Sequence, residues 1–264
     1  MGDSSWLASM PEIYDGRLVG PVFAPYGEDL VRRASAVGPH RVLELAAGTG
    51  AVTAPLVTAL PDAEIIATDL NEPMVRYAQA RVVGPTWETA DAQALAYPAG
   101  SFDLVLCQFG VMFLPDRIAA YQGIHRVLRD GGSFLFNAWD TLETHIVETA
   151  VIDSLAEIFP HNAPDFLRRV PHGYANPQII RSDVEAAGFD IAALERVELT
   201  GRAESALSLA EGYCLGTPLR FELAELGDPA DAVAPLAEAL TERFGTGPVD
   251  VPMSALVVHA LASR

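Results

Sequence analysis

The residues with the clearest chemical potential form a turn of small side chains, Glu44–Gly50, which ends the apolar run Arg41–Leu45. Glycines in such a turn let a ligand approach the backbone closely. The next segment, Ala51–Leu60, has helical composition. Because the start of a helix offers unpaired N–H groups and the positive end of a dipole, the pattern predicts a nucleotide-type site.

Three further polar positions follow in the order that a nucleotide site requires. Asp69 ends an apolar run, and its two carboxylate oxygens could accept hydrogen bonds from both hydroxyls of a ribose. Asp91, followed by Ala92, could accept a hydrogen bond from an exocyclic amine. Gln108 and Phe109 end another apolar run. The two aspartates could instead cap helices, and Gln108 could be an ordinary strand end, but their joint occurrence favours a ligand site.

The elements that must position these residues alternate along the chain. Apolar strand candidates occur at 41–45, 64–68, 86–89, 102–108, 133–139, 189–200 and 253–262, and segments of helical composition separate them. One of these helices, Ala119–Leu128, is expected to stop at Gly131. The alternation predicts an α/β, Rossmann-like fold with a mostly parallel seven-stranded sheet flanked by helices.

We expect one domain over residues 1–264, with four parts. Residues 1–38 form a helical N-terminal cap, and residues 39–140 form the cofactor-binding core. Residues 141–176 form a lid or insertion, and residues 177–264 complete the core.

The composition limits the classes of partner. The 264 residues carry a formal net charge of −18, which opposes binding to nucleic acid. The sequence shows neither a membrane-spanning apolar run nor a secretory signal, so we expect a cytoplasmic protein without a membrane span, acting as a monomer or homodimer. Its two cysteines form neither a disulfide framework nor a metal site, and Cys107 is predicted to be a core residue.

The spacing of the glycines discriminates between nucleotides. A dinucleotide fingerprint requires a third glycine where this chain has Thr53, and that glycine permits close packing beside a pyrophosphate. An NAD(P)-dependent oxidoreductase is therefore disfavoured but remains an alternative. A P-loop is excluded, because no Gly-Lys-Ser/Thr sequence follows the turn.

With these residues in place, the chain resembles the class I S-adenosylmethionine-dependent methyltransferases. The resemblance is to the broad "methyltransferase type 11" group, which includes quinone-biosynthesis C-methyltransferases. It is specific over about residues 40–140 and rests on the segments Val42–Gly50, Ala67–Met74, Ala90–Ala92, Ser101–Gly110 and Arg126–Gly132. One departure concerns the first glycine of the family's turn, which is Ala46 in this chain.

The resemblance implies a set of contacts with S-adenosylmethionine. Around the methionine portion, it implies roles for Glu44, Ala46, Gly48, Gly50, Gln108 and Phe109. Around the nucleoside, Asp69 would hold the ribose, Leu70 and Met74 would flank the adenine, and Asp91 and Ala92 would bind its amine edge. No metal is implied. The product of the cofactor would be S-adenosylhomocysteine.

The reaction expected is in-line SN2 transfer of a methyl group to a small organic acceptor. Positioning supplies much of the rate in such a reaction, and a general base is needed only for a poorly acidic nucleophile. His145 and His172 are base candidates, although each could be an ordinary surface or structural histidine. Aromatic residues predict an apolar or aromatic acceptor, and Tyr14, Phe23 and Trp139 are candidate substrate-binding residues. The alternative is a protein that binds the cofactor without transferring methyl.

Overall fold

One sheet of seven strands organises the computed structural model, which describes residues 10–263. The strand order is β3-β2-β1-β4-β5-β7-β6. The strands are β1 (Arg41–Leu45), β2 (Glu64–Asp69), β3 (Thr86–Thr89), β4 (Phe102–Gln108), β5 (Leu128–Trp139), β6 (Phe189–Ala203) and β7 (Val249–Ala262). Strands β1 to β5 pair in parallel, and β7 pairs with β5 in the antiparallel direction. The mostly parallel α/β fold predicted from the sequence is therefore confirmed.

The helices fall between these strands. They are α2 (Ala24–Val37), α3 (Thr53–Ala59), α4 (Glu72–Gln79), α5 (Arg117–Val127), α6 (Ile146–Ile158), α7 (Phe166–Arg169), α8 (Pro177–Ala186), α9 (Ala206–Gly216), α10 (Leu219–Ala224) and α11 (Val233–Phe244). A π-helical segment, η1 (Asp15–Phe23), precedes α2, and the single turns η2 (Val111–Phe113), η3 (Leu142–Thr144) and η4 (Pro229–Ala232) are 3-10 helices.

The chain divides into two compact units. Unit 2 contains Tyr26–Asp140, Tyr174–Val197 and the last segment, which begins at Ala255. Unit 1 contains the described residues up to Pro25, together with Thr141–Gly173 and Glu198–Ser254. The prediction of one domain with four parts stays a prediction, although residues 141–173 of unit 1 nearly match the expected insertion of 141–176.

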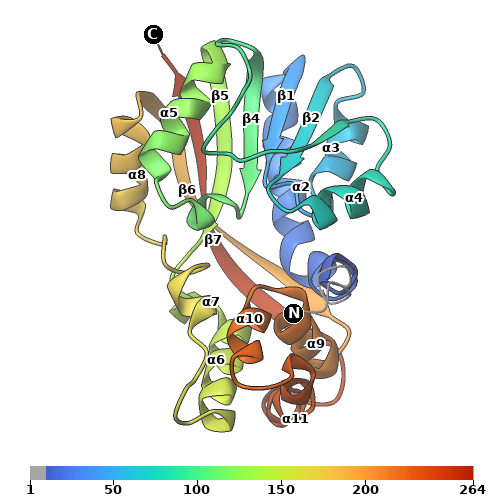
Figure 1. Cartoon of the computed structure of the whole chain (residues 1–264). Helices are drawn as coiled ribbons and strands as arrows, with labels where there is room; N and C mark the ends of the chain where they lie inside the picture. Colours follow the sequence, from blue (N-terminus) through green and yellow to red (C-terminus); the bar gives the residue numbers. More distant parts are fainter. Residues whose placement is uncertain (1–9, 264) are drawn as a thin grey trace. The chain divides into compact units, whose positions relative to one another are not determined.

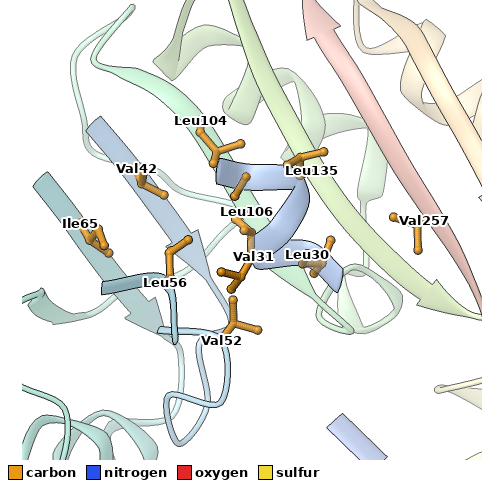
Figure 2. Packing of buried hydrophobic residues seen from close by; sticks show 11 residues of the cluster. Leu30, Val31, Val42, Val52, Leu56, Ile65, Leu104, Leu106, Leu135 and Val257 are labelled. Atoms are coloured by element: carbon orange, nitrogen blue, oxygen red, sulfur yellow. The ribbon is translucent and has the colours of Figure 1, made fainter. Parts of the chain in front are cut away.

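In unit 2, helices α2 and α3 cover one face of the sheet. Figure 2 shows side chains from both helices directed toward residues of β1, β2, β4, β5 and β7. The members of this cluster are Leu30, Val31, Ala34, Val42, Val52, Leu56, Ile65, Leu104, Leu106, Leu135 and Val257. Because alternate residues of a strand point to opposite faces, the strand residues of this cluster share one face of the sheet.

Helix α5 of unit 2 packs against β5, and α8 packs against α5 (Figure 1). Tyr121 of α5 is fully buried, and its ring lies 5.4 Å from that of Phe134 and 5.6 Å from that of Phe136. The sheet is therefore covered on both faces, which explains why its central strands are continuous apolar runs rather than alternating ones.

Unit 1 is mainly helical. Helix α9 packs against η1 and α11, and α11 also contacts α6. The approach to η1 is close, because a Cβ added at Gly212 of α9 would lie 2.7 Å from the Leu18 side chain. Glu222 of α10 fixes the start of α7 by accepting the backbone N–H groups of Asp165 and Phe166.

The predicted stop of the helix before β5 is wrong. Helix α5 ends at Val127, and β5 already begins at Leu128. Phe102 pairs with Leu128, but the next pair joins Leu104 to Ser133, so residues 129–132 bulge from the ladder. The left-handed Gly131, with φ of 70°, therefore serves a β-bulge and not a helix cap.

Candidate functional site

The strand register gathers polar side chains at the carboxyl edge of unit 2. Gln108 of β4 pairs directly with Asn137 of β5, and the partners of Glu44 lie two residues before Asp69 and two before Gln108. Because side chains alternate along a strand, all four of these polar residues belong to the face covered by α2 and α3. Carboxyl ends of parallel strands are where open α/β sheets bind ligands.

The turn after β1 has the conformation that the small residues predict. Ala46, Gly48 and Gly50 have φ of 52°, 57° and 89°, a region that residues with a Cβ rarely adopt. A Cβ at Gly50 would also lie 3.3 Å from the Trp87 ring. The turn is tied to β2, because Ala47 N–H donates to the Thr68 carbonyl at 2.9 Å.

Ala46, which stands where the resemblance implies a glycine, is accommodated by a glycine elsewhere. A Cβ added at Gly110, after β4, would lie 2.6 Å from the Ala46 Cβ and 2.7 Å from Cys107 Sγ. The Ala46 methyl group therefore occupies space that a side chain at Gly110 would need. Two turns that belong to neighbouring strands thus interlock, and one of them must lack a Cβ.

Asp69 holds the turn after β1 in place through hydrogen bonds. One carboxylate oxygen accepts the Gly48 N–H at 2.8 Å, and the other accepts the Asn71 N–H at 2.8 Å. Burial raises the pKa of Asp69, whereas these backbone hydrogen bonds lower it. Each carboxylate oxygen has a second lone pair, so both can still accept a hydroxyl group.

Glu44 is the most strongly perturbed acid of this edge. It is 1% exposed, and burial raises its pKa to about 8, with the charge of Asp69 acting in the same direction and the Thr53 hydroxyl opposing. Within the described residues, its Oε2 atom has no hydrogen-bond partner. A buried acceptor of this kind fits a cationic or hydrogen-bond-donating group of a ligand.

The residues expected around an adenine differ in exposure. Leu70 is 70% exposed, whereas Met74 is buried. Asp91 and Ala92 are half-buried. The Asp91 carboxylate accepts the N–H of Gln93 at 2.9 Å, but the segment that follows is a turn, so Asp91 does not cap a helix. This bond leaves further lone pairs for a ligand, so the proposed role of Asp91 stays a prediction.

An aromatic cluster lies at the ends of β4 and β5. The rings of Phe109 and Trp139 are stacked, with centroids 3.5 Å apart and an interplanar angle of 11°. Tyr26 of α2 meets both rings edge-on at 5.3 Å. Both stacked residues are buried. Trp139 is therefore packed within unit 2, and its expected contact with a substrate stays a prediction.

Asn137 is a site residue that was not predicted from the sequence. Its Oδ1 accepts the N–H of Phe109 at 2.8 Å, and Phe109 has the left-handed φ of 49°. The available signal was a single amide in the otherwise apolar run Phe134–Trp139. That signal does not reveal the partner, because the partner comes from another strand.

The remaining candidates belong to unit 1. The rings of Tyr14 and Phe23 are 4.9 Å apart. His145 is buried and its Nδ1 lies 3.0 Å from Thr144 Oγ1, while its ring is 4.5 Å from that of His172. The structure thus brings the two histidines together. Their role as bases, and that of the two aromatic residues in substrate binding, stay predictions.

Among residues 10–263, no cluster of three or more His, Cys, Asp or Glu side chains has an arrangement that could hold a metal ion. Over the same range, the helices are too short or too polar to cross a bilayer. Cys107 is buried, as predicted for a core residue.

The chain is similar to known methyltransferases. Residues 42–132 match a family model described as a methyltransferase domain. A demethylmenaquinone methyltransferase of Thermus thermophilus is 30% identical over 185 residues, which cover 63% of this chain and 84% of that protein. An uncharacterized protein of Mycobacterium tuberculosis is 41% identical over 45% of this chain and 44% of its own length. The match therefore spans less than half of that relative.

Solved structures share the fold. A phospholethanolamine N-methyltransferase of Haemonchus contortus, solved with S-adenosylhomocysteine, superposes with a TM-score of 0.59 at 16% identity. The superposition covers 100% of this chain and 58% of that one. At this level of identity, the similarity concerns the fold.

The interlocked turns predict non-additive substitutions. Gly110→Ala should destabilise the protein by about 1–3 kcal/mol, as overpacking does, because the new methyl group meets Ala46 and Cys107. In the double variant with Ala46→Gly, part of this loss should be recovered. Urea unfolding of the two single variants and the double variant measures the coupling. Additive free energies would show that the two turns do not compete for space.

The burial of Glu44 predicts a pH-dependent stability. The pKa of Glu44 is about 8 in the folded chain and about 4.3 in an unfolded one. Between these values the folded state binds more protons, so stability falls as pH rises. The difference in unfolding free energy between Glu44→Gln and the wild type should therefore change in favour of the variant as pH rises from 5 to 8, by roughly 2–4 kcal/mol. Urea unfolding across this range is the measurement.

Glu64→Gln is the matched control for that experiment. Glu64 is exposed, and the Arg41 guanidinium lowers its pKa, so its replacement should leave the slope between pH 5 and pH 8 unchanged. If the unfolding free energy of the wild type and that of Glu44→Gln changed equally with pH, a neutral buried Glu44 would be ruled out.

Proposed function

Because the chain belongs to the class I S-adenosylmethionine-dependent methyltransferases, we propose that it transfers a methyl group to a small apolar or aromatic acceptor. The observation that carries this proposal is the set of polar groups at the carboxyl edge of unit 2. A ligand with a nucleoside and an amino-acid group needs hydrogen-bond acceptors and a backbone that it can approach closely. The acceptors would be Glu44 and Asp69, and the backbone would be the left-handed turn at residues 46–50.

The residues present fit the cofactor. S-Adenosylmethionine carries an ammonium, a carboxylate, ribose hydroxyls and an adenine. Within residues 10–263, Glu44 Oε2 and the buried Thr49 hydroxyl both lack hydrogen-bond partners, and such groups are expensive to bury alone. Glu44 would accept from the ammonium, and Asp69 would accept from the ribose. Leu70, Met74, Asp91 and Ala92 would contact the adenine.

The chemistry requires little covalent help from the protein. When bound, the cofactor supplies a methyl group that is already activated by a sulfonium. The chain would hold donor and acceptor in line, and alignment of this kind can supply on the order of 7–11 kcal/mol in favourable systems. Gln108 and Phe109 would lie near the sulfonium. For an acceptor with a poorly acidic nucleophile, His145 or His172 would remove the proton.

The acceptor class rests on two supports. The aromatic residues Phe109, Trp139, Tyr14 and Phe23 favour an apolar or aromatic ring, and the Thermus thermophilus relative is named for demethylmenaquinone. A reduced demethylmenaquinone is therefore the first acceptor to test. Formation of S-adenosylhomocysteine together with a methylated ring, detected by mass spectrometry, would support the proposal.

Cofactor binding provides the decisive test. Asp69→Asn should weaken S-adenosylmethionine binding by roughly 10- to 100-fold, the effect expected when 1–3 kcal/mol of buried hydrogen bonding is lost. Isothermal titration calorimetry measures this affinity. Asp62→Asn makes the same change at an exposed position and should leave binding intact. Binding of NADH in place of S-adenosylmethionine by the wild type would refute the proposal.

A further inference from the structure

The Asn137 carboxamide has a fixed orientation. Its oxygen and nitrogen cannot exchange places, because the Phe109 N–H that faces the side chain at 2.8 Å requires an acceptor. Oδ1 must therefore face Phe109, and Nδ2 must point away from it. The assignment of the oxygen and nitrogen atoms follows from this hydrogen bond alone, so it does not depend on how the neighbouring rings are oriented.

The Nδ2 group is a donor without a partner. Asn137 is 0% exposed, and nothing in the described part of the chain accepts a hydrogen bond from its Nδ2. A buried donor without a partner destabilises the folded state. Such a cost is expected where a ligand or an ordered water completes the bonding.

The same side chain supports a strained turn. Phe109 has a φ of 49°, which a non-glycine residue rarely adopts. The hydrogen bond from its N–H to Asn137 is one of the contacts that hold it there. Strained residues concentrate at functional sites. The strained Phe109 backbone and the unpaired Asn137 donor are in contact, so both indicate that this part of unit 2 has a function.

The strand order separates Asn137 from the residues proposed to bind the cofactor. The ribose and adenine candidates follow β2 and β3, and the methionine candidates follow β1 and β4. Asn137 lies on β5, one strand further along the edge. A ligand group there would lie next to the methionine candidates, on the side away from the ribose and adenine candidates.

We propose that the Asn137 Nδ2 group donates a hydrogen bond to an oxygen atom of the methyl acceptor. The acceptor class is then an aromatic or other apolar ring that carries a carbonyl or phenolic oxygen, bound beside the Phe109 and Trp139 rings. This assignment rests on the proposed methyl transfer. It makes Asn137 a specificity-determining residue that also positions Phe109.

A matched ligand pair tests the oxygen directly. 1-Tetralone and tetralin share a fused ring system, but only tetralone has a carbonyl oxygen. Calorimetry on wild type saturated with S-adenosylhomocysteine gives the ratio of the two dissociation constants. In Asn137→Asp, which keeps an acceptor for the Phe109 N–H and has no donor once its carboxyl group is ionised, the preference for tetralone should fall about tenfold at a pH above the titration of that group.

Two controls exclude a purely structural effect. Asn176→Asp makes the same chemical change at the exposed N-cap of α8 and should leave the preference unchanged. Lowering the pH in Asn137→Asp protonates the new carboxyl group and supplies an O–H donor, so part of the preference should return. Loss of packing alone would not depend on pH in this way.

Three outcomes would overturn the assignment to the acceptor. One is a wild type that shows no preference for tetralone, and another is a preference that survives Asn137→Asp. The third is a tenfold loss of S-adenosylhomocysteine affinity with an unchanged tetralone preference, because Nδ2 would then bind the cofactor carboxylate.

Failure of the proposed function is a separate result. It would appear as wild type that does not bind S-adenosylhomocysteine. The ratio for tetralone and tetralin can still be measured on the protein alone, and Asn137→Ala provides a second variant if Asn137→Asp does not fold.

Discussion

The site depends on how closely the turns after β1 and β4 approach each other. Ala46 and Phe109 both adopt left-handed backbone conformations, and the Ala46 methyl group fills the space above Gly110. Each turn therefore limits the conformations of the other. The hydrogen bond between Phe109 and Asn137 extends this constraint to β5. Because the three strands are adjacent in the sheet, one set of contacts positions backbone and side chains along the whole edge.

Much of the fold could be predicted because apolar runs and small-residue turns are local signals. The strands from β1 to β4 were predicted within one residue of their observed ends. The bulge at residues 129–132 was missed, since a glycine after a helical segment is equally compatible with a helix cap and with a bulge. Which one forms depends on the pairing with β4, and pairing between distant segments is not a local property.

The candidate site was predicted unevenly for the same reason. Glu44, Asp69 and the turn glycines follow from spacing along the chain, and their conformation and hydrogen bonds agree with it. Asn137 could not be recognised, because its role depends on a backbone N–H of another strand. The sequence also predicted His145 and His172 as separate candidates, whereas their rings are in contact. The division into two units was not foreseen.

The neutral state of Glu44 links cofactor affinity to the solvent. A cation that binds beside this side chain favours its ionised form, so binding would expel a proton into the buffer. By mass action, the apparent affinity for such a cation would rise with pH until Glu44 is ionised in the free protein, near pH 8. The measured binding enthalpy would then include the heat of protonating the buffer. A single buried carboxyl group would thereby make the protein respond to the acidity of its surroundings.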